Sequence, residues 1–88
     1  MQVTFRSSFA RDLKKIKSQP LLGRIRHAIE QVEAAASLAQ VEHLKKMSGA
    51  DSFYRIRIGD YRIGIVVDEG RVEFVRCLSR RDLYRFFP

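Results

Sequence analysis

The chain has 88 residues, which is enough for one small domain with a modest hydrophobic core. Its 17 Lys and Arg residues outnumber 10 Asp and Glu, and the net charge of +7 indicates an anionic partner such as nucleic acid, a membrane surface or an acidic protein. No apolar run approaches the roughly 20 residues of a membrane span, and the N-terminus lacks an apolar signal segment, so we expect a cytoplasmic protein with no membrane attachment.

The first 36 residues predict one strand followed by two helices. Residues 2–6 alternate apolar and polar side chains, as a half-buried strand does. The serines at 7–8 offer an N-cap, and residues 9–17 then form a short amphipathic helix whose apolar face is Phe9, Leu13 and Ile16. Residues 18–20 interrupt it. A second helix is expected over about 21–36, with the apolar stripe Leu22, Ile25, Ile29, Val32 and Ala36. The short break favours an antiparallel helical hairpin.

Residues 37–52 give the weakest signal in the chain. Val41, Leu44 and Met47 are compatible with one more apolar turn, or with a connecting loop that these three side chains hold down. The composition of residues 48–51, Ser-Gly-Ala-Asp, is that of a loop.

The second half predicts three strands and a closing helix. The strands are residues 53–58, 61–67 and 71–78, and the helix is residues 80–87. Gly59-Asp60 suits a tight two-residue hairpin in which glycine supplies the positive φ, and Asp68-Glu69-Gly70 makes the second turn. The expected order is β-α-α-β-β-β-α, a single α+β domain over residues 1–88. In it the N-terminal strand and helical hairpin pack on an antiparallel sheet.

The first hairpin fixes which side chains share a face. With Gly59-Asp60 as the loop, Ile58 pairs with Tyr61, Arg57 with Arg62, and Arg55 with Gly64. One face is then apolar and can be covered by the helices: Tyr54, Ile56, Ile58, Tyr61, Ile63, Ile65 and Val67. The other face carries the three arginines.

Two opposed arginines destabilise a sheet, and an anion on this face would remove the repulsion. Gly64 beside Arg55 leaves room for something to approach the backbone. A solvated face on a half-exposed sheet is the plainer interpretation. Three arginines next to a glycine favour a phosphate site.

The register of the third strand stays open. If Glu69-Gly70 alone form the turn, Cys77, Val75 and Glu73 join the basic face. If Asp68 also belongs to the turn and a bulge follows, Arg76, Phe74 and Val72 join it instead, and a fourth arginine faces Arg62.

The C-terminal helix adds further basic residues. Arg80 and Tyr84 lie four residues apart on one helix face, so Tyr84 could stack on a base while Arg80 reaches a phosphate. Leu83, Phe86 and Phe87 could equally pack on the core. Cys77 is the only cysteine and is expected to be a buried, inert thiol; no Cys/His spacing indicates zinc, and no cofactor or metal is expected.

Several of these segments resemble the RelE/ParE superfamily of bacterial toxins. The resemblance lies in the run Leu44-Lys-Lys-Met-Ser-Gly…Tyr54-Arg-Ile-Arg-Ile-Gly-Asp-Tyr-Arg62, in Arg80-Arg-Asp-Leu-Tyr84 and in Ser8-Phe-Ala-Arg-Asp-Leu-Lys-Lys. It covers essentially the whole chain and implies the toxin half of a toxin–antitoxin pair. RelE-like members cut mRNA, typically in the ribosomal A site and without metal or cofactor, whereas ParE-like members inhibit DNA gyrase.

The resemblance also implies a set of catalytic residues. Arg62 matches the phosphate-stabilising arginine of the superfamily, Arg80 the arginine near the C-terminus and Tyr84 the C-terminal tyrosine. Arg55 and Arg57 stand where RelE has lysines, and an always-charged guanidinium is a poor general base. His27 and His43 show no partner in the sequence. Catalysis could then rest on electrostatics alone, with help from Tyr84 or Glu73, or the protein could be a weak nuclease.

Two binding surfaces follow from the same resemblance. Contacts with mRNA and the ribosome are expected from further basic residues, namely Arg81, Arg85, Lys14, Lys15, Lys17, Lys45 and Lys46. An acidic, partly disordered antitoxin is expected to fold along the apolar surface near the C-terminal helix, at Leu83, Phe86 and Phe87, giving a hetero-oligomer.

Overall fold

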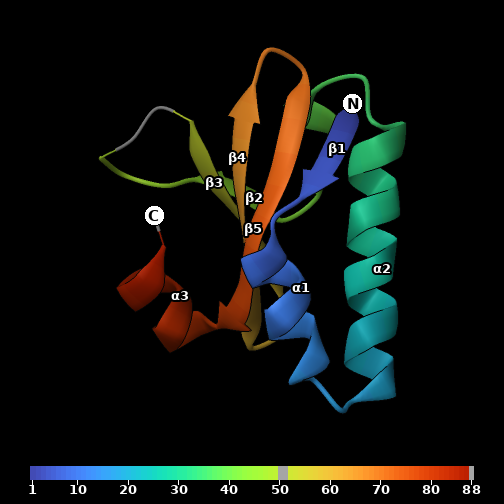
Figure 1. Ribbon diagram of the computed structural model, residues 1–88. Coiled ribbons are helices and arrows are strands. Elements are labelled where there is room, and N and C mark those ends of the chain that lie inside the picture. The colour runs from blue at the N-terminus through green and yellow to red at the C-terminus, as the bar shows by residue number, and fades with distance from the viewer. Residues whose placement is uncertain (50–51, 88) are drawn as a thin grey trace.

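The computed structural model describes residues 1–49 and 52–87, so Ala50 and Asp51 of the predicted 48–51 loop lie outside the described residues. The predicted α+β fold is confirmed (Figure 1). Three helices surround one five-stranded sheet with the strand order β1-β5-β4-β3-β2. The strands and helices in chain order are β1 (Gln2–Phe5), α1 (Ser7–Lys14), α2 (Gln19–Ala34), β2 (Leu44–Lys46), β3 (Phe53–Ile58), β4 (Tyr61–Asp68), β5 (Arg71–Ser79) and α3 (Arg80–Phe86). The sheet is mixed, because β1 runs parallel to β5 while the other pairs are antiparallel.

The helix boundaries differ from the prediction in ways that the caps explain. Helix α2 begins at Gln19 because the Ser18 hydroxyl accepts a hydrogen bond from the backbone N–H of Leu21 and Pro20 fits the first turn. The prediction that the serines at 7–8 cap α1 is wrong: Arg6 occupies the N-cap position, and its side chain makes no capping bond. None of the helices in the described part of the chain is long and apolar enough to cross a membrane.

The segment between α2 and β3 contains a strand that was not predicted. After a 3-10 turn at Leu38–Gln40, β2 pairs with β3 so that Leu44 lies opposite Ile56. Val41 and Met47 are buried on either side of it, as anchors of a loop would be. A three-residue strand at a sheet edge is too short for an alternating pattern to reveal it.

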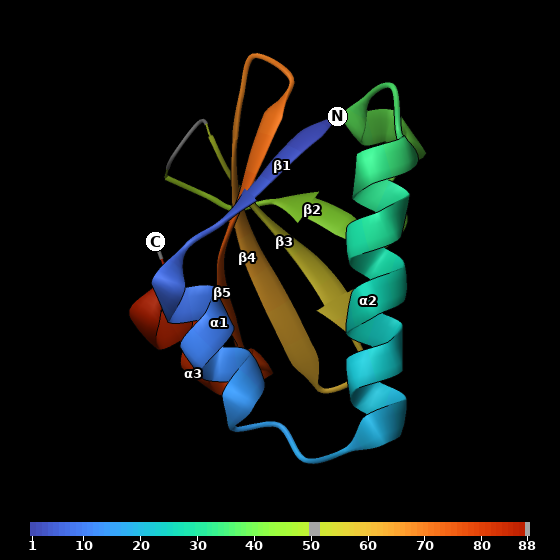
Figure 2. The ribbon, with the colours of Figure 1, turned by 45° about the vertical axis from the view of Figure 1, so that its right-hand side comes forward.

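The main core lies between the helices and the predicted apolar face of the sheet (Figure 2). Ile56 and Ile63 from the hairpin pack there with Phe9 of α1 and with Ile25 and Val32 of α2, all at most 2% exposed. Tyr54, Tyr61 and Val67 border this cluster. The hairpin register is confirmed pair by pair, from Ile58 opposite Tyr61 to Arg55 opposite Gly64.

A second, smaller core lies on the other face of the sheet, under α3. It consists of Met47, Val75, Leu83 and Phe87. The space predicted beside Gly64 is therefore not open, because the Phe87 ring fills it: a Cβ built on Gly64 would lie 2.8 Å from Cδ2 of that ring. Both faces of the sheet are thus partly covered, and α3 occupies part of the face that carries the arginines.

The register of β5 combines the two alternatives. Glu69-Gly70 form the turn, since Asp68 pairs with Arg71, and Glu73 pairs with Val66 on the basic face. A bulge then makes Val75 the extra residue, so that Arg76 pairs with Gly64 and Cys77 returns to the core. The second alternative placed a fourth arginine opposite Arg62, but Leu78 lies there, and Arg76 lies opposite Gly64 instead.

Side chains of α1 hydrogen-bond to backbone groups of β5 that lack a strand partner, because the bulge interrupts the ladder and β1 ends before them. The Ser8 hydroxyl donates to the Val75 carbonyl at 2.6 Å. The Asp12 carboxylate, almost fully buried, accepts from the Cys77 N–H at 2.9 Å and from Nε of Arg76 at 2.8 Å. Ser8 and Asp12 lie four residues apart on one helix face, which positions α1 along the strand edge.

Candidate functional site

The three hairpin arginines share one face of the sheet, and a lysine extends their row. Arg57 and Arg62 are opposed across β3 and β4, and Lys45 of β2 pairs with Arg55. The position of Lys45 beside Arg55 could not be predicted, because it depends on strand β2. Opposed residues share a face, so four cationic side chains gather on three neighbouring strands.

Arg62 lies at the centre of this cluster and is 8% exposed. Its Nη1 donates to the carbonyl oxygens of Gly59 and Tyr61, at 2.7 and 2.9 Å, which fixes the guanidinium against the hairpin turn. Its Nε is buried and makes no hydrogen bond within the described part of the chain, and the same is true of Nε of Arg55. Buried donors of this kind usually have a partner, so these two atoms indicate a place for an acceptor.

The charges around Arg62 show that the predicted catalytic residues come together. Burial lowers the pKa of Arg62 most, and Arg55, Arg80 and Arg57 lower it further, while Tyr84 raises it. Arginine stays protonated despite such shifts. The other four residues selected from the sequence therefore lie within electrostatic reach of Arg62, and like-charged neighbours there would gain from a bound anion.

Helix α3 supplies Arg80 and Tyr84, the two remaining residues of the predicted catalytic set. The backbone N–H of Arg80 donates to the Asp60 carbonyl at 2.8 Å, which ties the start of the helix to the hairpin turn. Tyr84 is 54% exposed and borders a cleft of about 220 Å³ with Lys45, Met47 and Arg55. An exposed aromatic ring beside cations is suited to stacking on a base.

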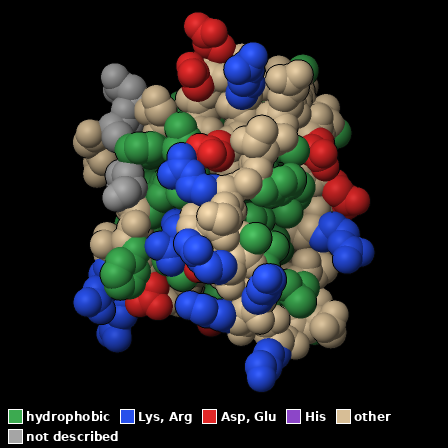
Figure 3. Space-filling view, viewed as in Figure 1, with side chains coloured by type: hydrophobic (Ala, Val, Ile, Leu, Met, Phe, Trp, Pro, Cys, Tyr) green, Lys and Arg blue, Asp and Glu red, His purple; other side chains and the backbone are tan. Residues whose placement is uncertain are grey.

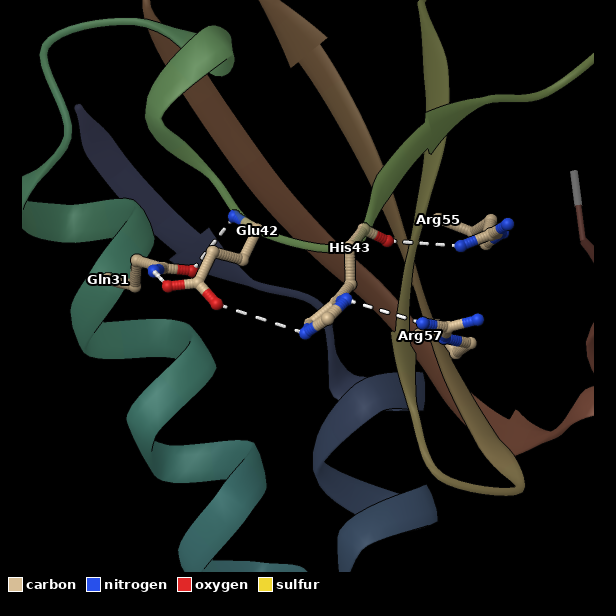
Figure 4. Close-up of polar contacts among 5 residues, drawn as sticks. All are labelled: Gln31, Glu42, His43, Arg55 and Arg57. Carbon is tan, nitrogen blue, oxygen red and sulfur yellow. Dashed lines mark hydrogen bonds and ion pairs between the residues drawn. The ribbon is translucent and has the colours of Figure 1, made fainter.

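His43 has partners that the sequence did not reveal. Its backbone is left-handed, with φ of 62°, and its carbonyl accepts from the Arg57 N–H at 3.1 Å and from Nη1 of Arg55 at 3.0 Å. The ring lies between Nη2 of Arg57, 3.5 Å from Nδ1, and Oε2 of Glu42, 3.8 Å from Nε2 (Figure 4). Gln31 of α2 holds Glu42 through two hydrogen bonds of 3.1 Å. The expectation that His43 lacks a partner is wrong.

The remaining predicted residues lie around this centre or apart from it. Glu73 forms an ion pair with Arg6 at 2.6 Å and pairs with Val66, four residues along β4 from Arg62. The other basic residues assigned to RNA and ribosome contacts are all exposed: Lys14, Lys15, Lys17, Lys46, Arg81 and Arg85. Figure 3 shows Lys and Arg side chains gathering over the lower half of the molecule, around α1 and α3.

The three residues assigned to antitoxin binding divide into two groups. Leu83 and Phe87 are 0% and 4% exposed and belong to the second core, whereas Phe86 is 55% exposed. Cys77 is buried as predicted, and burial raises the pKa of its thiol to about 12. Across residues 1–49 and 52–87, no group of three His, Cys, Asp or Glu side chains could hold a metal ion.

The fold and this cationic cluster define a small basic α+β protein, and its similarities to known proteins give the class. The model of the family described as "ParE toxin of type II toxin-antitoxin system, parDE" matches residues 3–84. Toxin RelE3 of Methanocaldococcus jannaschii is 38% identical over the full length of both chains. A putative toxin RelE1 of the same organism is 31% identical over 82% of this chain and 83% of its own.

Solved structures agree with these relatives. The RelB-RelE antitoxin-toxin complex from Methanococcus jannaschii contains a chain that superposes with a TM-score of 0.81 at 37% identity, covering 96% of this chain and 98% of the other. The YoeB dimer from Staphylococcus aureus has the same fold, with a TM-score of 0.74 at 17% identity, covering 91% of this chain and 97% of the other. The chain belongs to the ParE toxin family of type II toxin–antitoxin systems, within the RelE/ParE superfamily.

Proposed function

We propose that this toxin is a ribosome-dependent, metal-independent mRNA endonuclease that blocks translation and is neutralised by a cognate antitoxin. The observation that carries the proposal is the buried guanidinium of Arg62. Its Nε has no acceptor among residues 1–49 and 52–87, and three further arginines and Tyr84 lie within electrostatic reach of it. Such an arrangement is preorganised for the charge that develops on a phosphodiester during cleavage. The relatives named RelE support the same class.

The proposed reaction is an internal transesterification. The 2′-hydroxyl oxygen attacks the adjacent phosphorus and gives its proton to a base. The 5′-oxygen of the next nucleotide leaves and takes up a proton, so that a 2′,3′-cyclic phosphate and a 5′-hydroxyl result. Arg62, Arg55 and Arg57 would stabilise the negative charge on the phosphoryl oxygens, while Arg80 and Tyr84 would position the strand.

His43 is the group in this cluster best suited to move the proton. Imidazole exchanges protons near neutral pH, which the guanidinium groups cannot do. The ring has Oε2 of Glu42 3.8 Å from Nε2 on one side and Nη2 of Arg57 3.5 Å from Nδ1 on the other. It therefore lies between the carboxylate that would stabilise an imidazolium and the face that would hold the phosphate. Glu73 would take no part, since it is paired with Arg6.

The surrounding surface would hold the larger partners. Exposed basic residues on α1, β2 and α3 would contact ribosomal RNA through its phosphates. An acidic antitoxin segment would bind near α3, where exposed Phe86 borders a cleft of about 390 Å³ that also contains Arg6, Val75 and Arg76. Complexes of RelE-like toxins with RelB antitoxins, as in Methanococcus jannaschii and Pyrococcus horikoshii, support this pairing and a hetero-oligomer.

Inhibition of DNA gyrase is the second candidate function, because the matching family model is that of ParE toxins. In that case the arginine face would be dispensable for toxicity, and arrest would come with DNA damage.

Expression from a tightly repressed promoter, with mapping of transcript 5′ ends, separates the candidates. Cuts at a fixed position within translated codons are expected, and Arg62→Ala should abolish them. Because Arg62 also supports the hairpin turn, Arg80→Ala provides a second variant at an exposed position. Arg71→Ala, an exposed arginine at the far end of β5, is the matched control and should still cut.

The other outcomes point elsewhere. Growth arrest without such cuts, unchanged by Arg62→Ala, would contradict the nuclease and direct the search to gyrase. RNA binding with neither cuts nor arrest would leave a non-catalytic RNA-binding module.

A further inference from the structure

A third cleft, of about 340 Å³, lies between α2 and the outer edge of β3. Its floor is apolar and consists of Ala28, Ile56 and Ile58, whereas its rim carries hydrogen-bonding and charged groups from Arg24, His27, Gln31, Glu42, His43 and Arg57. An apolar floor with a few converging polar groups is typical of small-molecule sites, and this volume is at the small end of their range.

The cleft exists because β2 is short. Strand β2 pairs with β3 only as far as Ile56, so Arg57 and Ile58 lie beyond the last ladder pair. The carbonyl of His43 accepts from the Arg57 N–H, as the next residue of a longer β2 would do. The left-handed backbone of His43 then turns the chain away from α2. The edge of β3 and the side of α2 therefore remain separated instead of closing into the core.

Arg57 connects this cleft to the cationic cluster. It pairs with Arg62 across the hairpin and also lines the cleft. His43 likewise lines the cleft while its carbonyl holds Arg55 and Arg57. Arg62 and the apolar floor of the cleft lie on opposite faces of the hairpin, so a strand of RNA whose phosphate contacts Arg62 would reach the cleft around the open edge of β3 at Arg57.

We infer that the cleft is a nucleobase subsite for the nucleotide adjacent to the one held on the arginine face. The imidazole rings of His27 and His43 and the planar guanidinium groups of Arg24 and Arg57 offer stacking surfaces that accept any base. The Glu42 carboxylate, which Gln31 holds at the rim, supplies an acceptor for exocyclic amino groups, so bases that carry such a group should bind more tightly than uracil. In naming mRNA as the source of the base, the inference rests on the proposed function.

Other occupants fit the same residues less well. A phosphate alone has no use for the floor of Ala28, Ile56 and Ile58. An acidic peptide would bring its carboxylates towards Glu42, whose own carboxylate is on the rim. A base avoids both costs, because its faces are apolar and its edge donates hydrogen bonds.

Titration of the full chain with the four nucleoside 5′-monophosphates, followed by amide NMR shifts, tests the inference without requiring nuclease activity. We expect shifts at Gln31, His43 and Ile58, larger for the amino-bearing bases than for uridine monophosphate. His27→Ala and Arg24→Ala should weaken binding by about tenfold each, the loss of one stacking contact. Arg26→Ala is the matched control, since it removes an exposed arginine of the same helix that does not line the cleft.

Four results would overturn the inference. The same shifts with inorganic phosphate as with the nucleotides would leave only an anion site. Shifts of the cleft amides with a short polyglutamate peptide, but not with nucleotides, would assign the cleft to a protein partner. Nucleotide shifts confined to Arg55 and Arg62, or equal affinity in Arg24→Ala and Arg26→Ala, would place base binding elsewhere. Failure of the nuclease proposal would instead appear as absent transcript cuts, whatever the titration gives.

Discussion

The ring of Phe87 occupies the place where a side chain on Gly64 would begin, with Cδ2 at 2.8 Å and Cγ at 2.9 Å from a Cβ built on that glycine. This contact joins the last residue of the second core to the middle of β4. It holds α3, and with it Arg80 and Tyr84, against the face that carries Arg62.

Gly64→Ala should therefore release α3 rather than merely strengthen a strand. The new methyl group must displace a ring that is 4% exposed, and overpacking of this kind costs about 1–3 kcal/mol of the free energy of unfolding. Urea denaturation measures the loss. Gly23→Ala, at a helical glycine with open space around it, is the control and should stabilise by up to about 1 kcal/mol. Equal effects of the two substitutions would show that the Phe87 contact is unimportant.

Replacing Arg57 by threonine should stabilise the fold while it reduces cleavage. The substitution removes a like charge opposite Arg62 and introduces a residue that favours strands, for a gain of roughly 0.5 kcal/mol in thermal or urea unfolding. Arg71→Thr is the control. Arg71 is also exposed on a strand but faces Asp68, so its replacement removes an attraction and should not increase the free energy of unfolding. A loss of stability in Arg57→Thr would mean that the opposed arginines are not strained against one another.

His43→Gly separates backbone strain from ring chemistry. Glycine adopts the φ of 62° freely, so the variant should unfold with a free energy higher by about 1 kcal/mol. Loss of the imidazole should slow transcript cleavage by about 10²-fold if the ring transfers the proton. Glu69→Gly relieves a similar left-handed residue in the β4–β5 turn and should gain stability with full cleavage. Unchanged cleavage by His43→Gly would remove the imidazole from the mechanism.

The buried thiol makes stability depend on alkaline pH. Burial raises the pKa of Cys77 from 9.0 to about 12, and the Asp12 carboxylate acts in the same direction. Between pH 9 and pH 12 the Cys77 thiol therefore stays protonated in the folded state but ionises in the unfolded state. Its contribution to the free energy of unfolding is complete below pH 9 and is lost as pH rises towards 12. The free energy of unfolding should fall by up to about 1.4 kcal/mol per pH unit in that range relative to Cys77→Ala. Parallel pH profiles for the two proteins would contradict this.

The sequence predicted those parts of the fold that depend on neighbouring residues. The hairpin at Gly59-Asp60 followed from strict alternation and a turn glycine, and the apolar and basic faces followed from the hairpin. The two features of the site that were missed both depend on β2. Three residues at a sheet edge carry no period, and without that strand neither Lys45 nor His43 could be placed beside the arginines.

The bulge in β5 was beyond prediction for a different reason. Residues 71–79 are apolar or bulky on both faces, so alternation does not select a register, and the polar groups that fix it come from Ser8 and Asp12, more than 60 residues away. The grouping of Arg80 and Tyr84 with the hairpin arginines could be proposed from the family resemblance, but the filling of the space beside Gly64 by Phe87 could not.

The extra residue at Val75 has a consequence for how this chain can change in length. Deleting it would make the ladder regular, with Phe74 and Cys77 still facing the main core and Arg76 still opposite Gly64. Arg80 and Tyr84 would therefore keep their places beside the hairpin arginines. The deletion would remove the Val75 side chain from the second core and the carbonyl that accepts from Ser8. The bulge is thus a place, like the turn at Glu69-Gly70, where the chain can change length by one residue without exchanging the two faces of β5.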